Sequence, residues 1–120
     1  MIDEPDTVVT QADGTATFSV RVVREIDVDS APALEEALAR ALRSDTRRTV
    51  VDLSETVFAD STILHVLMEA RRRHEAAGRP MVVAGPLSDV VRRLFDVTGT
   101  AAFFGLGPDG GTAASAGADA

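Results

Sequence analysis

Strict alternation of apolar and polar positions marks the start of the chain. In residues 15–23 every second side chain is apolar, which predicts a strand with one buried face. A shorter β-like segment at 7–12 precedes it, and Asp13 with Gly14 between the two is a turn dipeptide typical of hairpins. These segments therefore predict an antiparallel pair.

Helical spacing of apolar residues then recurs along the chain. One helix is predicted over 34–42, and Ser30 and Pro32 mark its start. Another is predicted over 90–95, with Ser88 as its cap. Another helix is expected to follow the stretch FADSTILHVL at 58–67 and to end near an Ala-Gly pair at 77–78. On the first of these helices, Glu36 and Arg40 have the spacing of an ion pair.

A short strand is predicted at 49–53, and the continuous apolar run at 80–85 predicts a strand covered on both faces. Residues 101–104 are expected to add either a short final strand or a docking segment. The segment 24–32 is interpreted as a loop. The resulting order β-β-α-β-α-β-α predicts an α/β fold, because parallel strands joined by crossover helices build such sheets. We expect a small mixed sheet, mostly parallel with an antiparallel N-terminal hairpin, packed with three to four helices.

Composition sets the limits of the domain. A chain of 120 residues with 45% hydrophobic side chains suits one domain, and the absence of Trp and Tyr predicts an aliphatic core. We expect a flexible N-terminus at 1–6, the domain at 7–105 and a disordered tail at 106–120, which is rich in Gly and Ala. The G-x-G-x-x-G match at 105–110 lacks a strand-to-helix context and is no nucleotide signal.

Charge and cysteine content narrow the class of function. A net charge of −7 argues against nucleic acid as a partner, since phosphate binding needs a concentrated basic surface. No signal peptide and no apolar stretch of about 18 residues is found, so no membrane partner is expected. With no Cys, the sequence fits a reducing cytoplasm. The pattern of apolar residues requires no large apolar patch on the surface, so we expect a monomer.

Residues for catalysis or metal binding are few. His65 and His74, the only two histidines, lie on opposite sides of one helix, so no metal site and no cofactor are expected. Asp27, Asp52 and Asp60 are placed to cluster at strand ends, where open α/β folds bind ligands, but three scattered carboxylates are weak evidence for a magnesium site. Ser61 and His65 are four residues apart, but no nucleophile elbow surrounds them. No catalytic residue is predicted, and the chain is not expected to be an enzyme.

The polar triplet Asp60, Ser61 and Thr62 stands between two apolar stretches. All three residue types are favoured helix caps, because their oxygens accept hydrogen bonds from free amides of the first turn. One residue would suffice for a cap, however. A hydroxyl at a helix N-terminus is also a good phosphate site, because the helix dipole stabilises added negative charge. The triplet is therefore a cap, a modification site, or both.

The helix after the triplet has an apolar face with a shoulder. Ile63, Leu67 and Ala70 are expected to face the sheet, and Leu64 and Met68 lie to one side of them. These two residues either extend the core or form the edge of an interface, where methionine suits adaptable contacts. His74 is expected to be a hydrogen-bonded boundary residue.

Five motifs together resemble one protein family. They are EID at 25–27, AP at 31–32, VVDLS at 50–54, VFADS at 57–61 and RRLFDVTG at 92–99. In this order they are similar to STAS domains, and most of all to the bacterial anti-sigma factor antagonists (anti-anti-sigma factors). The resemblance runs from about 7 to 104.

The resemblance implies a function by partner switching. In that family the unphosphorylated antagonist binds an anti-sigma factor serine kinase, an ATPase of histidine-kinase-like fold, and so frees a sigma factor. Phosphorylation ends the binding, and a serine phosphatase restores it. By position, Ser61 is the implied phosphoacceptor, with Thr62 as a secondary candidate. The implied partner surface comprises Asp27, Asp60, Ser61 and Thr62, with Leu64 and Met68 added from the shoulder.

Two departures from the family pattern bear on the partner. Ile63 stands where the family usually has Gly, which would place a branched side chain where the kinase approaches. Arg24 stands where a Gly usually precedes EID. Two other functions stay open. One is a STAS scaffold or accessory subunit, in a stress-signalling complex or a lipid ABC transporter. The other is a small nucleotide-binding regulator that uses Asp27 and Asp60.

Overall fold

The structure, a computed structural model, describes residues 8–106. Its elements follow each other as β1 (Val8–Asp13), β2 (Thr17–Val22), β3 (Arg24–Ile26), α1 (Ala31–Arg43), β4 (Arg48–Asp52), β5 (Thr56–Ala59), α2 (Thr62–Ala76), β6 (Met81–Ala84) and α3 (Asp89–Val97). The expectations for 1–6 and for 107–120 lie outside the described residues. Leu106, which we assigned to the tail, is buried, so the ordered domain reaches at least this residue.

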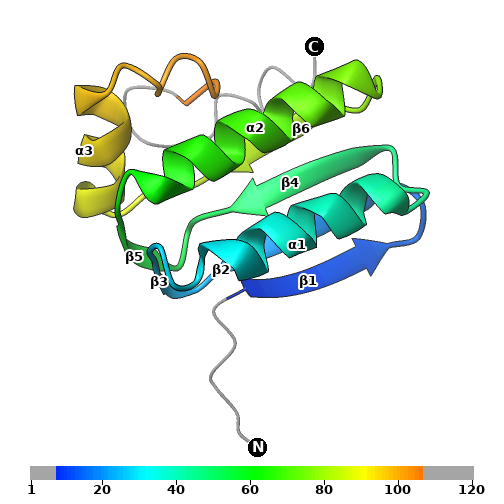
Figure 1. The fold of residues 1–120 in the computed structure, drawn as a ribbon, viewed down its shortest axis with the longest axis horizontal. Helices are drawn as coiled ribbons and strands as arrows, with labels where there is room; N and C mark the ends of the chain where they lie inside the picture. The colour runs from blue at the N-terminus through cyan, green and yellow to red at the C-terminus, as the bar shows by residue number, and fades with distance from the viewer. Residues whose placement is uncertain (1–7, 107–120) are drawn as a thin grey trace, which may run out of the picture.

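The main sheet has four strands in the order β1-β2-β4-β6. β1 pairs with β2 antiparallel, and the other pairs are parallel, which confirms the mixed sheet with an N-terminal hairpin. Figure 1 shows α1 and α2 side by side across one face of this sheet, with α3 at one end. The alternation in β2 explains the packing, because Phe18, Val20 and Val22 are buried while the residues between them are not.

A second, two-stranded parallel sheet joins β3 and β5. We interpreted 24–32 as a loop, and this was wrong for Arg24–Ile26. A strand of three residues with two exposed polar side chains has no periodic signal, and it forms because its backbone pairs with the distant β5. Residues 101–104 form turns and no strand, with an isolated bridge at Leu106. Phe104 is buried against the core, so of the two expectations for this segment the docking segment is the one observed.

The core is aliphatic, as the composition predicts. Three phenylalanines add to it, and Phe95 and Phe104 meet edge to face at 5.7 Å between ring centroids. On α1 the expected ion pair is not formed: Glu36 pairs with Arg43 at 3.0 Å, and Arg40 reaches the Thr10 hydroxyl on β1. Arg40 therefore bonds to the neighbouring strand β1 and not to Glu36, although Glu36 is four residues away on the same helix.

Polar groups join α1, α2 and β4 at the end of the domain where β4 and β6 begin. His74 is fully buried, with Nδ1 2.8 Å from the Ala70 carbonyl oxygen and Nε2 3.0 Å from the Thr49 hydroxyl. Arg79 donates to the carbonyl oxygens of Ala41, Leu42 and Ser44, at 3.4, 3.3 and 2.7 Å. His74 is thus a hydrogen-bonded residue, as expected, and lies deeper than a boundary position.

Candidate functional site

The polar triplet lies between β5 and α2, and only one of its side chains caps the helix. Asp60 Oδ1 accepts a hydrogen bond from the Thr62 amide at 2.9 Å, and the Asp60 carbonyl accepts from the Ile63 amide. Ser61 occupies the N-cap position, but its side chain makes no cap hydrogen bond. Ser61 is exposed and Thr62 half-buried, so the Ser61 hydroxyl is the more accessible of the two.

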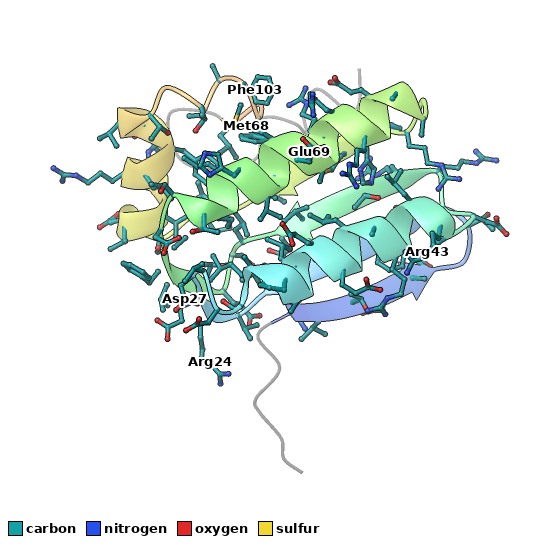
Figure 2. All side chains as sticks on the ribbon, viewed as in Figure 1. Arg24, Asp27, Arg43, Met68, Glu69 and Phe103 are labelled. Atoms are coloured by element: carbon teal, nitrogen blue, oxygen red, sulfur yellow. The ribbon has the colours of Figure 1, made fainter. Side chains whose placement is uncertain are left out.

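Asp27 lies beside this loop because β3 and β5 pair. Ile26 is in register with Ala59, and the Asp60 amide donates to the Ile26 carbonyl at 3.3 Å. The residues that follow each strand, Asp27 and Asp60, therefore leave the small sheet together. Figure 2 shows Asp27 with Arg24 at this end of the molecule.

The carboxylate of Asp27 is already engaged by its own turn. Its Oδ1 accepts from the amides of Asp29 and Ser30, both at 3.1 Å, and from the Ser30 hydroxyl. The hydrogen bonds from Ser30 hold the pKa of Asp27 below its usual range, so this side chain is an anion at neutral pH. A partner that approaches Ser61 therefore meets fixed negative charge.

Leu64 and Met68 differ in exposure although both lie on the same shoulder of α2. Leu64 is 6% exposed and belongs to the core, whereas Met68 is 39% exposed. The covered face of α2 is therefore wider than the stripe of Ile63, Leu67 and Ala70, and it includes Leu64. Of the two, only Met68 offers an apolar surface, and it lines a shallow hollow with Thr62, His65 and Phe103.

Ile63 does not face a partner. Its side chain is fully buried and fills the core below the first turn of α2. The expectation that Ile63 would obstruct an approaching kinase is therefore wrong, because the helix turns this position toward the sheet. Arg24 has a φ of 68°, a left-handed conformation that favours glycine, which accounts for the Gly usual at this position and leaves Arg24 in a strained conformation.

Three exposed apolar residues at the same end were missed by the sequence interpretation. They are Val28, 67% exposed, and the neighbours Val57 and Phe58 on β5, 60% and 45% exposed. Two adjacent exposed side chains break the alternation of a strand. The only local signal is the unbroken apolar run VFA at 57–59.

The described part of the chain brings together few side chains that could bind a metal ion or act in catalysis. Within residues 8–106, no group of three or more His, Cys, Asp or Glu side chains is placed to hold a metal ion. His65 is exposed, and no hydrogen bond joins it to Ser61. None of the helices of the described residues is long and apolar enough to cross a bilayer.

A family model described as "Mlab, STAS domain" matches residues 9–106. The chain belongs to the STAS domain family. Its curated relatives include the anti-sigma-B factor antagonist of Staphylococcus aureus, 32% identical over 82 residues, which cover 68% of this chain and 75% of the relative. These findings confirm the resemblance drawn from the motifs.

Solved structures agree with this STAS fold. The crystal structure of an anti-sigma factor antagonist from Mycobacterium paratuberculosis matches with a TM-score of 0.71 and 29% identity, over 89% of this chain and 91% of that one. The anti-sigma factor antagonist SpoIIAA in its unphosphorylated form matches with a TM-score of 0.68 over 77% and 80% of the two chains. At 17% identity, the second likeness shows the fold alone.

Proposed function

We propose that this STAS domain is an anti-sigma factor antagonist that is switched by phosphorylation of Ser61. In the unphosphorylated form it binds an anti-sigma factor serine kinase in the cytoplasm and so frees a sigma factor. It is a binding protein and a kinase substrate, not an enzyme. The names of its relatives support the general role. The observation that carries the switch is the exposed Ser61 hydroxyl, which has no part in capping α2.

The position of Ser61 suits a phosphate without loss of the fold. The helix dipole at the N-terminus of α2 stabilises negative charge there, and Asp60 continues to cap the helix. The phosphate adds about two negative charges next to Asp60 and Asp27. In a desolvated interface this charge would oppose binding, and each ~1.4 kcal/mol lowers affinity tenfold.

The remaining proposed contacts follow from exposure. Asp60 and Thr62 flank Ser61 in the chain, Asp27 leaves the small sheet beside Asp60, and Met68 is exposed farther along α2. Leu64 is buried, so it would contribute to partner binding only indirectly, by packing beneath the first turns of α2. A serine phosphatase that restores the binding form completes the cycle, and its access to Ser61 is as open as that of the kinase.

The test is phosphorylation and binding with purified candidate anti-sigma factor kinases from the same genome. Intact-mass spectrometry with ATP should find one phosphate on wild type and on Thr62→Ala, but none on Ser61→Ala. Calorimetry should find that Ser61→Asp weakens binding to the same kinase at least tenfold. If no kinase binds or phosphorylates the folded protein, the proposal is wrong.

One observation favours a second candidate function. The matching family model is named for Mlab and makes no reference to sigma factors. The alternative is an accessory STAS subunit of a lipid ABC transporter. Such a subunit should copurify with a membrane ATPase, and its binding should be unaffected by Ser61→Asp, so the same variant separates the two functions.

A further inference from the structure

A β-bulge exposes two neighbouring apolar side chains on β5. Arg24 is in register with Thr56 and Glu25 with Phe58, so Val57 is an extra residue between the two pairs. A bulge of this kind re-aims the side chains beside it. As a result Val57 and Phe58 both face outward, while Thr56 and Ala59 on either side are buried.

Val28 adds a third exposed apolar side chain in the turn after β3. We call Val28, Val57 and Phe58 the apolar tip. Single exposed apolar residues are ordinary on protein surfaces. Here, however, two of them lie on β5 and the third lies in the turn after β3, the strand that pairs with β5. Phe58 precedes Ser61 by only three residues. Any partner that reaches the Ser61 hydroxyl therefore comes close to the tip.

The charged residues around the apolar tip indicate which kind of partner surface would bind there. The segments 24–29 and 52–61 carry six carboxylates and one arginine, and none of these side chains is buried. Arg21 on β2 pairs with one of the carboxylates, that of Glu55, at 3.6 Å, so the surface around the tip keeps a net negative charge. The carboxylates are those of Glu25, Asp27, Asp29, Asp52, Glu55 and Asp60. An acidic rim of this kind is repelled by anionic lipid and attracts basic protein surface. Charge complementarity therefore favours a protein partner over a membrane.

We propose that the apolar tip is the anchor of the partner interface, and that the partner presents an apolar recess bordered by lysine and arginine side chains. The inference rests on the proposed function, in which that partner is the anti-sigma factor kinase. Aromatic side chains in such positions commonly dominate binding energy, and a charged rim mainly raises the association rate. The pairing of β3 with β5 holds the tip in place before the partner arrives.

The test compares Phe58→Ser and Val28→Ser with Val97→Ser, in kinase binding by surface plasmon resonance. Val97 is a matched control for Val28, because it is also a valine, 70% exposed, and lies on α3 outside the tip. We expect Phe58→Ser to raise Kd at least tenfold through faster dissociation, with the control within about twofold. Circular dichroism and thermal melting establish that each variant is folded.

The rim is tested separately by ionic strength and by Glu25→Gln. The association rate of wild type should fall several-fold between about 50 and 500 mM salt, and Glu25→Gln should reduce it without changing the dissociation rate. A kinase that binds wild type and Phe58→Ser equally would overturn this inference and leave the proposed function intact. Failure of wild type to bind any kinase overturns both. Binding of the tip to phosphatidylglycerol vesicles in place of the kinase would also overturn it.

Discussion

The Thr62 amide donates a hydrogen bond to the Asp60 carboxylate at 2.9 Å. The side chain that caps α2 is therefore that of Asp60, and not the hydroxyl of Ser61 at the N-cap position. Because Asp60 caps the helix, the Ser61 side chain is not needed for capping. The same triplet thus holds a structural residue and, in the proposed function, a regulated one. Each can be changed without the other.

Asp60→Ala should lower the free energy of unfolding by about 1 kcal/mol, the usual effect of losing a helix cap. Ser61→Ala should change it by less than about 0.5 kcal/mol, because the exposed hydroxyl contributes no cap hydrogen bond. Urea denaturation measures both. Asp60→Asn, which retains an acceptor oxygen, is the control and should fall between them. A larger loss for Ser61→Ala than for Asp60→Ala would show that Ser61 is the cap.

Arg24→Gly should stabilise the fold. A non-glycine residue in the left-handed region costs about 1 kcal/mol or more, and glycine removes the steric part of this cost. Arg24→Ala keeps the Cβ atom and removes the charge, so it should bring no gain. A melting temperature raised by Arg24→Gly alone would establish backbone strain, and equal effects of both variants would contradict it.

Ile63→Gly should be severely destabilising. It removes a fully buried side chain, which costs about 2–5 kcal/mol for truncation to alanine, and adds about 1 kcal/mol for glycine in a helix. Ile63→Val should cost only about 1 kcal/mol. Urea denaturation midpoints give the comparison. A glycine variant that is as stable as wild type would mean that Ile63 lies outside the core.

Stability should decrease on mild acidification because of His74. Burial lowers its pKa, so the folded protein binds a proton less readily than the unfolded chain. The free energy of unfolding therefore has its full value above about pH 6.5, the ordinary pKa of histidine. It decreases as the pH drops from there toward the pKa of His74 in the folded protein.

The measurement is urea denaturation between pH 8 and pH 5 for wild type, His74→Leu and His65→Gln. His74→Leu should lose most of this pH dependence, at the expense of an unpaired buried Thr49 hydroxyl, which costs about 1–3 kcal/mol. The exposed His65 is the control, and its variant should retain the wild-type profile. Identical profiles for all three proteins would exclude His74 as the source.

The sequence predicted those parts of the fold whose signal is local. Alternation located β2, and helical spacing located α1 and α3, because each buries one face against the core. β3 and β5 escaped prediction because they exist through long-range pairing with a bulge, which no local period encodes. Motif resemblance pointed to Asp27 and Asp60 together, and the pairing of those two strands is what brings them to one end of the domain.

Exposure within the site was harder to predict. Leu64 and Met68 lie on the same shoulder of a helical wheel, yet the tertiary packing buries only Leu64. In the same way, Ile63 was placed toward a partner on the strength of a motif position, whereas the wheel alone put it toward the sheet. A position in a motif gives the residue type, and the surrounding elements decide which way the side chain points.

The hydrogen bonds of His74 and Arg79 lie where β4 and β6 begin, and Ser61 lies where β5 ends. The end of the domain where His74 and Arg79 join α1, α2 and β4 by hydrogen bonds is thus separate from the end that binds the partner in the proposed function. Related proteins can therefore exchange recognition residues at one end while the other end preserves the fold. Within one cell, several such proteins could diverge in the partners they choose and still share a single scaffold.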